Sequence, residues 1–272
     1  MNKEMRNKVA GAIYGFAIGD AMGATTEFMT AEKIQKRYGK VKNIIGGGWL
    51  NLRLGEVTDD TQMTMCVMDA IMKTRNRMQF IKHCEDNFIA WVKTNPKDIG
   101  CQCSKAIHDL MIGKKTKIDN HALGNGSLMR AMPLAVLNGE LFNIAQGRIT
   151  HNNDLCASII LDYSRLLQDY LNDRNTDKYT NKIKGLLEPS GYIVNTFNNS
   201  VYWSCQDSFE EAIIGAVNHG GDADTIAAIA GSLAGAKFGY DNIPKGWINP
   251  LDSDVKEFLE KFKNFAFSYL QI

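Results

Sequence analysis

Two short acidic clusters stand where apolar helices are expected to begin. The first, DADT, covers residues 222–225 in the stretch HGGDADTIAAIAGSLAGAKFG, and the second, TDDT, covers residues 58–61. Read alone, each cluster is typical of an ordinary helix N-cap, because Asp and Thr side chains accept bonds from free backbone N–H groups. An acidic residue in GDAMGATTEF adds a third position. Together they predict one site built from Asp59, Asp60, Asp222, Asp224 and Glu27.

Such a carboxylate cluster needs positive charge nearby. Like charges raise one another's pKa values, whereas hard divalent cations neutralise them and also accept Thr hydroxyl oxygens as ligands. Two such ions would offset most of the charge. Ligands that are all oxygen favour magnesium, manganese or calcium over zinc, and no His or Cys lies inside the clusters. The clusters therefore predict a site for two divalent cations.

A glycine-rich stretch supplies a second kind of chemistry. HALGNGSLMRAMPLAV places Gly-Asn-Gly-Ser before another apolar helix, at residues 124–127. Glycines at a helix N-terminus let backbone N–H groups approach a phosphate closely. An ordinary turn is the alternative, because Asn-Gly is a common turn pair.

The elements that position these groups are expected to be helices. FIKHCEDNFIAWVK, LCASIILDYSRLLQDYL and VKEFLEKFKNFAFSYL each repeat apolar residues at spacings of three and four. Ser208 and Glu211 form a capping-box signature before AIIGAVNH. Only GYIVNTF and VKNII look extended, and no linker divides the chain. The sequence predicts an all-α fold in which residues 1–272 form a single domain.

Glycine recurs every four residues in two of the expected helices. The first row is Gly11, Gly15, Gly19 and Gly23; the second is Gly231, Gly235 and Gly239, after Ala227. Each row follows one helix face, and interior glycines cost about 1 kcal/mol each relative to alanine. Close backbone approach between the two helices is the expected gain. It would bring Asp20 and Glu27 near Asp222 and Asp224.

The overall composition excludes several classes of protein. A net charge of +1 provides no large basic field, so strong general nucleic-acid binding is not expected. No stretch of 18 uncharged apolar residues is present and no apolar run follows a basic region at the amino end, so neither membrane insertion nor secretion is expected. The six cysteines are scattered without zinc spacing. We expect reduced thiols in a cytoplasmic protein.

Taken in order, the motifs resemble those of the ADP-ribosylglycohydrolases. They span residues 11–247 as GAIYGFAIGDAMGATTEF, TDDTQMTM, KDIGCQC, GNGSLMRAMPLA, THNND and GGDADTIAAIAGSLAGAKFG, followed by IPKGW. The resemblance implies an orthogonal helix bundle with a cleft that holds two Mg²⁺ or Mn²⁺ ions. One departure is Cys103, which stands where many members have threonine.

The resemblance also implies roles for individual residues. It assigns metal binding to Thr58, Asp59, Asp60, Asp222, Asp224 and Thr225. It makes Glu27 a catalytic residue beside the metals, with Asp98 a further active-site carboxylate. It assigns substrate binding to Gly124, Asn125, Gly126, Ser127 and His151.

The reaction implied is hydrolysis of the glycosidic bond at the distal ribose of ADP-ribose. Glu27, or a metal-ligating aspartate such as Asp59 or Asp60, would move the proton. The substrate would be an ADP-ribosylated protein or another ADP-ribose conjugate. Arginine, serine, a nucleic-acid base and a small molecule all remain open as the acceptor.

Two other classes of protein are alternatives. One is a non-catalytic ADP-ribose binder or structural relative. The other is a magnesium-dependent phosphatase of the haloacid dehalogenase type, because DADT contains its D-x-D pair. That phosphatase site requires a preceding strand and a parallel sheet, whereas here a helical pattern comes first.

Overall fold

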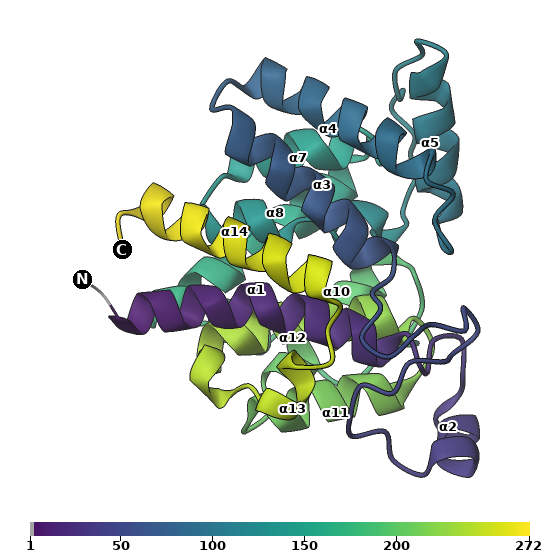
Figure 1. The fold of residues 1–272 in the computed structure, drawn as a ribbon, viewed down its shortest axis with the longest axis vertical. Helices are drawn as coiled ribbons and strands as arrows, with labels where there is room; N and C mark the ends of the chain where they lie inside the picture. Colours follow the sequence, from purple (N-terminus) through teal and green to yellow (C-terminus); the bar gives the residue numbers. More distant parts are fainter. Residues whose placement is uncertain (1–2) are drawn as a thin grey trace.

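The computed structural model describes residues 3–272, and the expected all-α fold is confirmed. Within this range every regular element is helical, and extended pairing is limited to isolated bridges such as Thr30 with Gly220. The elements are α1 Lys3–Gly23, α2 Ala31–Tyr38, α3 Asp59–Lys73, α4 Arg77–Val92, α5 Cys101–Met111, η1 Asn125–Ser127, α6 Met132–Val136, α7 Glu140–Arg148, α8 Asp154–Leu171, α9 Asp177–Thr180, α10 Ile193–Ser204, α11 Phe209–His219, α12 Ala223–Phe238, η2 Tyr240–Asn242, α13 Lys245–Ile248 and α14 Ser253–Leu270 (Figure 1).

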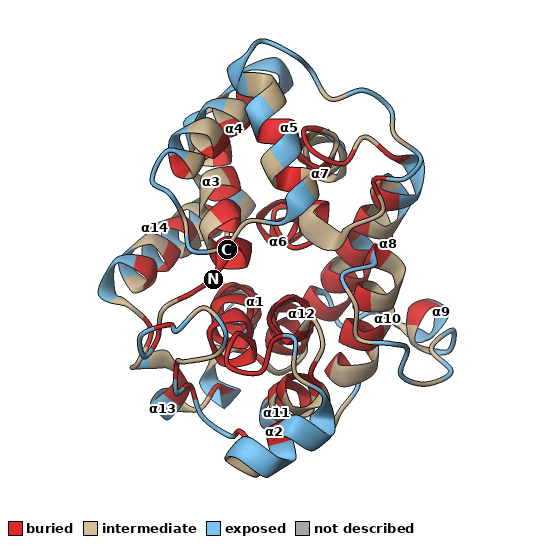
Figure 2. Cartoon of the chain, turned by 90° about the vertical axis from the view of Figure 1, so that its right-hand side faces the viewer, coloured by how far each residue is buried: buried red, intermediate tan, exposed pale blue. Residues whose placement is uncertain are grey.

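The centre of the molecule is the pair formed by α1 and α12. The two helices lie side by side, with α14 and α3 on one side of them and α10, α11 and α13 on the other (Figure 1). Every residue from 8 to 23 in α1 and from 223 to 236 in α12 is buried (Figure 2). Both helices are therefore enclosed all round, which explains why neither has a polar face.

The glycine rows bring these two helices into backbone contact, as predicted. A Cβ atom added at Gly15 would lie 2.3 Å from the carbonyl oxygen of Gly231, and one at Gly19 would lie 2.0 Å from that of Ala227. The contact is reciprocal, since a Cβ at Gly235 would lie 2.0 Å from the oxygen of Gly11. Only glycine permits this approach at these positions. It fixes the C-terminal end of α1 against the N-terminal end of α12.

The two stretches expected to be extended are not strands. In GYIVNTF, helix α10 already begins at Ile193, and its buried residues Ile193, Thr196 and Ser200 repeat at helical spacing against α12. In VKNII, Val41 pairs with the Asn218 side-chain amide, which both donates to and accepts from its backbone. Tertiary packing thus overrides the β-branched composition of both segments.

This arrangement removes the phosphatase alternative. DADT follows α11 and a two-glycine turn rather than a strand, and no parallel sheet forms within residues 3–272. None of the helices in this range combines the length and apolar character that a bilayer crossing requires.

Candidate active site

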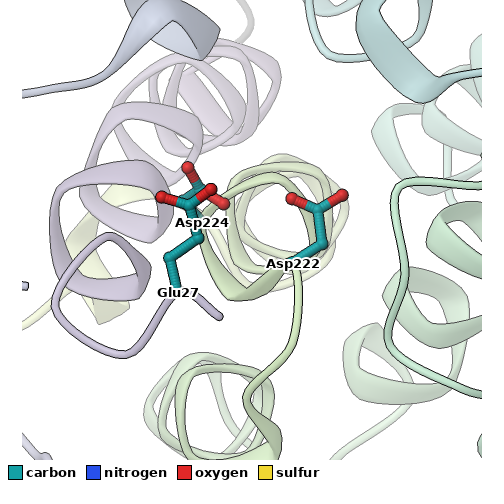
Figure 3. Close-up of side chains that lie close together, drawn as sticks. All are labelled: Glu27, Asp222 and Asp224. Atoms are coloured by element: carbon teal, nitrogen blue, oxygen red, sulfur yellow. The ribbon is translucent and has the colours of Figure 1, made fainter. Parts of the chain in front are cut away.

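The acidic residues meet where α1 ends and where α3 and α12 begin. One carboxylate oxygen from each of Glu27, Asp222 and Asp224 lies within 4.8 Å of the other two, although Glu27 is almost 200 positions away in the chain (Figure 3). Asp60 joins them through Thr225, whose hydroxyl donates to Asp60 Oδ2 at 3.2 Å. The positive ends of α3 and α12 both face this cluster, which favours negative charge there.

Asp222 is the N-cap residue of α12 by position, yet its side chain caps nothing. Its carboxylate instead accepts a short hydrogen bond from Asn125 Nδ2, in the glycine-rich loop. Its backbone N–H donates to the Pro189 oxygen at 2.9 Å. Gly221 has φ +65°, and a Cβ there would lie 1.9 Å from the same oxygen. The turn therefore requires glycine and directs Asp222 into the cleft rather than onto its own helix.

Helix α3 is held in place by Asp20, which is wholly buried in α1. The Asp20 carboxylate accepts bonds from the Thr58 backbone N–H and hydroxyl, at 3.1 and 2.8 Å, and from the Thr61 N–H at 3.0 Å. Thr58 meanwhile caps α3 by accepting from the Asp60 N–H. Thr58 thus combines a capping role with a contact to the acidic cluster.

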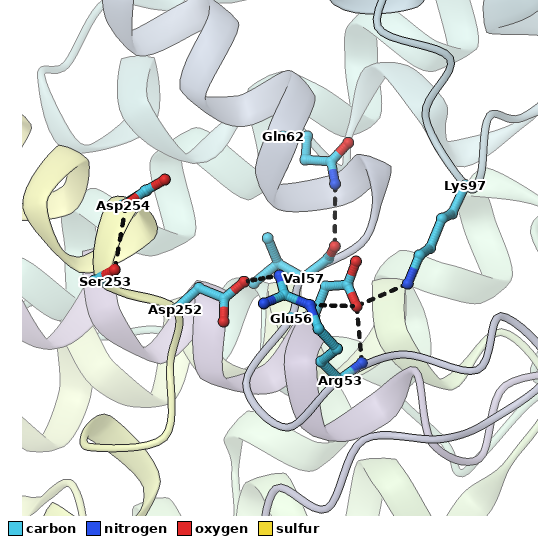
Figure 4. Close-up of polar contacts among 8 residues, drawn as sticks. All are labelled: Arg53, Glu56, Val57, Gln62, Lys97, Asp252, Ser253 and Asp254. Atoms are coloured by element: carbon cyan, nitrogen blue, oxygen red, sulfur yellow. Dashed lines mark hydrogen bonds and ion pairs between the residues drawn. The ribbon is translucent and has the colours of Figure 1, made fainter.

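The segment that precedes α3 is fixed by ion pairs at the surface (Figure 4). Arg53 Nη2 lies 2.7 Å from Asp252 at the start of α14, and Lys97 Nζ lies 2.8 Å from Glu56. The Gln62 side chain donates to the Val57 carbonyl oxygen at 3.1 Å. These contacts connect α14 and the Asp98 segment to the residues just before Thr58.

Burial and mutual repulsion dominate the electrostatics of the cleft. The pKa of Glu27 is raised to about 8, mainly by burial and further by the charges of Asp222 and Asp98. The hydrogen bond from Trp49 opposes this shift. Burial, followed by the charges of Asp98 and Asp20, raises the pKa of Asp59 to about 8. Burial and neighbouring carboxylates also raise the pKa values of Asp60 and Asp224 far above the usual range. The metal-free cluster therefore holds protons at neutral pH.

The chemistry of these groups fits hard cations. Within the described residues, Asp60 Oδ1 and Asp224 Oδ1 are buried oxygens without a hydrogen-bond partner. A buried carboxylate oxygen without a donor is costly unless a positive charge compensates for it. Oxygen ligands from carboxylates and hydroxyls suit Mg²⁺ or Mn²⁺.

The glycine-rich loop lies opposite the carboxylates. Asn125 begins the short helix η1, and its backbone N–H donates to Gly191 at 2.9 Å. A Cβ at Gly126 would lie 2.7 Å from Cys103 Sγ and 2.9 Å from His151 Cε1, so these side chains fill the space behind the loop. Ser127 is fully buried.

Arg130 supports the loop from below and does not line the cavity. It is fully buried and donates to the Gly126 oxygen at 2.9 Å and to the Thr150 hydroxyl at 2.6 Å. Thr150 in turn contacts His151 Nδ1 at 2.8 Å. Burial, and then the charge of Arg130, lower the pKa of His151 to about 3, so this imidazole is neutral.

Carboxylates and loop enclose one cavity of about 620 Å³. Of the residues singled out from the sequence, the structure places these along it: Glu27, Asp59, Asp60, Asp98, Gly124, Asn125, Gly126, His151, Asp222, Asp224 and Thr225. Thr58 and Ser127 lie behind its wall. The cavity thus brings distant motifs together, of which the glycine rows predicted only the approach of Glu27 to Asp222 and Asp224.

The sequence predicted that Asp20 lies near the cluster but gave it no role, and it did not predict the contacts that Trp49 and Phe28 make. Trp49 donates from Nε1 to Glu27 Oε2 at 2.6 Å, and Phe28 lines the cavity mouth. Asp20 positions α3 as described above. The only sequence signal for Asp20 is a carboxylate inside an otherwise apolar helix, whereas Trp49 lies in a loop that has no periodicity.

The helical fold brings a buried carboxylate cluster and a glycine-rich loop to one cavity. The chain belongs to the ADP-ribosylglycohydrolase family, whose sequence model matches residues 1–268. It is 35% identical to ADP-ribosyl-[dinitrogen reductase] glycohydrolase of Rhodospirillum rubrum, over 93% of this chain and 92% of that one. It is 28% identical to ADP-ribosylarginine hydrolase Tri1 of Pseudomonas putida (strain GB-1), over 89% of this chain and 73% of the relative.

A solved structure supports the same assignment. The chain superposes on an ADP-ribosylglycohydrolase-related protein complex with a TM-score of 0.80 at 25% identity, covering 99% of both chains. The protein is accordingly a glycosidic-bond hydrolase that removes ADP-ribose.

Proposed function

We propose that the protein hydrolyses the N-glycosidic bond between the distal ribose of ADP-ribose and an arginine side chain of a modified protein, with two Mg²⁺ or Mn²⁺ ions. The names of the Rhodospirillum and Pseudomonas relatives support a protein substrate, and the latter supports arginine. A cytoplasmic location stays a prediction from composition.

The observation that carries this proposal is the cluster of Glu27, Asp222 and Asp224. Two of its carboxylates and Asp60 belong to motifs that open helices, so their positions are set by backbone rather than by long flexible side chains. Thr58, Asp59, Asp60, Asp222, Asp224 and Thr225 would hold the ions. When bound, the ions would neutralise these carboxylates and polarise the attacking water.

The loop would bind the substrate diphosphate. Gly124, Asn125 and Gly126 line the cavity, and the glycines let the loop pack closely against Cys103 and His151 where η1 begins. Asn125 is held by Asp222 and Thr196, so the loop and the acidic cluster keep a fixed distance. Neutral His151 lines the cavity beside the loop, adds no charge and could donate or accept one hydrogen bond to the substrate through Nε2, since Nδ1 contacts Thr150.

Glu27 is the best placed group to move the proton. It lies inside the cavity, and its carboxylate lies beside Asp222 and Asp224, within reach of a water at the proposed cation site. The Trp49 bond fixes the orientation of its carboxyl group. Asp98 at the cavity edge and Asp59, which accepts from the Gly100 N–H at 3.3 Å, are the other candidates.

The test is release of free ADP-ribose from two peptides that differ only in an arginine- or serine-linked ADP-ribose. Wild-type protein is expected to act on the arginine peptide only with Mg²⁺ or Mn²⁺ present. Asp222→Asn/Asp224→Asn should lower kcat/KM by at least about 100-fold, because loss of metal-ion catalysis removes several kcal/mol of transition-state stabilisation.

Asp86→Asn provides the matched control, because Asp86 is an exposed carboxylate on α4 outside the cavity. Its activity should equal that of the wild type. Metal-independent release would contradict the cation assignment. ADP-ribose binding without release from either peptide would instead support the non-catalytic alternative.

A further inference from the structure

Two aromatic side chains stand exposed at the mouth of the cavity. Phe28 is 66% exposed and Trp49 is 52% exposed, and their rings form a pair with centroids 5.3 Å apart. Large aromatic residues are usually much more buried than this. Phe28 lines the cavity, and Trp49 donates a hydrogen bond to Glu27, which also lines it. The exposed pair therefore belongs to the edge of the active site.

The backbone forces Phe28 outward. Its φ of +58° is a left-handed conformation that a bulky side chain rarely adopts. The Phe28 N–H donates to the Gly221 oxygen at 2.7 Å, and the Gly221 N–H donates to the Met29 oxygen at 2.8 Å. These two bonds attach Phe28 to the turn that carries Asp222. Strain that is retained in this way at a cavity points to a functional role for the side chain.

Trp49 is held just as firmly, on a glycine loop. Gly46, Gly47 and Gly48 all have positive φ, and the Thr25 hydroxyl donates to the Gly46 oxygen at 3.0 Å. A Cβ at Gly48 would lie 2.2 Å from the Ala24 oxygen, so the loop lies directly on the residues after α1. The Nε1 bond to Glu27 then fixes the indole ring beside the carboxylate that we propose moves the proton.

The chemistry of this mouth suits a planar cation. The face of an aromatic ring attracts positive charge, and guanidinium groups stack on Trp and Phe. Six carboxylates line the cavity: Glu27, Asp59, Asp60, Asp98, Asp222 and Asp224. Two divalent cations carry only four positive charges, so the ionised cleft would keep a negative excess. A serine acceptor has neither a positive charge nor a flat surface to match these features.

We propose that Phe28 and Trp49 form the acceptor subsite, in which the guanidinium of an ADP-ribosylated arginine stacks against the aromatic pair. The inference rests on the proposed function and adds to it the residues that select the acceptor. Phe28 supplies a ring face, whereas Trp49 supplies a second face and aligns Glu27 with the bond to be cleaved.

The test compares Phe28→Leu with Phe28→Tyr, since leucine keeps an apolar side chain without a ring, whereas tyrosine keeps the ring and adds only a hydroxyl. On the arginine-linked peptide, Phe28→Leu should lower kcat/KM by about 2- to 30-fold, mainly through KM, as expected for loss of a cation–π contact. Phe28→Tyr should keep most of the wild-type kcat/KM on the same peptide. Affinity for free ADP-ribose, which lacks an acceptor, should be equal in all three proteins.

Tyr269→Leu is the control, because Tyr269 is an exposed aromatic residue on α14 away from the cavity. Equal kcat/KM values for Phe28→Leu and Phe28→Tyr would overturn the subsite. Trp49→Phe keeps a ring but removes the Nε1 donor. Trp49→Phe should therefore lower kcat and leave KM nearly unchanged. A change in KM alone would contradict the proposed alignment of Glu27.

A binding measurement separates this inference from the proposed function. Agmatine carries a free guanidinium group, and its binding to the protein saturated with ADP-ribose can be measured by calorimetry. If the wild type released no ADP-ribose but bound agmatine in a Phe28-dependent way, the proposed function would fail and the subsite would stand. Hydrolysis of only the serine peptide, without agmatine binding, would contradict both the proposed function and the acceptor subsite.

Discussion

Asp20 connects α1 to the start of α3, which carries one of the two acidic motifs, although it does not line the cavity. Its carboxylate uses both oxygens to accept bonds from Thr58 and Thr61. Burial raises its pKa, and those hydrogen bonds oppose the shift. An outer residue of this kind orients the groups that touch a metal, and such partners commonly matter almost as much as the ligands.

Asp20→Asn is therefore expected to lower both stability and activity. The amide keeps one acceptor oxygen, but its NH2 group faces either the Thr58 or the Thr61 donors, which leaves buried donors unpaired. We expect a loss of about 1–3 kcal/mol in the free energy of unfolding. Mn²⁺ affinity and kcat/KM should fall by about 10- to 100-fold. Urea denaturation, calorimetry and the peptide assay measure these changes, and Asp86→Asn is again the control. Unchanged Mn²⁺ affinity would show that Asp20 does not position the site.

At the scale of elements, the glycine contact between α1 and α12 determines where the cluster forms. Gly23 and Ala223 continue the same contact to the end of both helices, since a Cβ at Gly23 would lie 2.4 Å from the Ala223 oxygen. Glu27 follows this point by four residues, and Asp224 follows Ala223 directly. The distance between the helices therefore sets the distance between the carboxylates.

Gly15→Ala tests this dependence without touching the cleft. The new methyl group would lie 2.3 Å from the Gly231 oxygen and must push the helices apart. Overpacking of this kind should reduce the free energy of unfolding by about 3 kcal/mol, and Mn²⁺ affinity should fall with it. Gly246→Ala on α13 is the matched control, because nothing lies within 4 Å of its added Cβ. Equal stability of the two variants in urea would contradict the close approach.

At the scale of the whole molecule, the cleft couples folding to pH and to cations. Glu27 and Asp59 have pKa values of about 8 in the folded metal-free protein, against 4.5 and 3.8 ordinarily. Between about pH 4 and pH 8 the folded state thus binds protons that the unfolded state has released. The stability of metal-free protein therefore falls as pH rises through this range.

Divalent cations should reverse that loss. They bind the ionised carboxylates, so the rise in Tm on adding Mn²⁺ should be larger at pH 8 than at pH 5. At 100 times the dissociation constant the gain is about 2.7 kcal/mol, or about 5–10 °C in a chain of this size. Calorimetric scans in EDTA and in Mn²⁺ measure it. Asp222→Asn/Asp224→Asn should remove most of the Mn²⁺ effect, and an equal effect in that variant would place the cations elsewhere.

The sequence by itself determined the helical fold, the family and the residue types of the cleft. Helical periodicity and the recurrence of glycine at every fourth residue are patterns of residues close together in the chain. Helices α1 and α12 and the contact between them could therefore be predicted from residues 11–23 and 227–239. The oxygen-only motifs likewise predict hard-cation chemistry, because the ligand types are set by the residue types alone. That residues 1–272 form a single domain stays a prediction of the same kind.

Only the tertiary structure decided which side chains face one another. Trp49 reaches Glu27 from a loop with no periodic pattern, and Asp20 pairs with a helix that begins almost 40 residues later. Asp222 lies at an ordinary capping position, yet its carboxylate turns to Asn125 instead. Residues 193–197 are helical although their β-branched composition favours a strand. In each case packing between distant segments sets the outcome, because local spacing carries no information about such contacts.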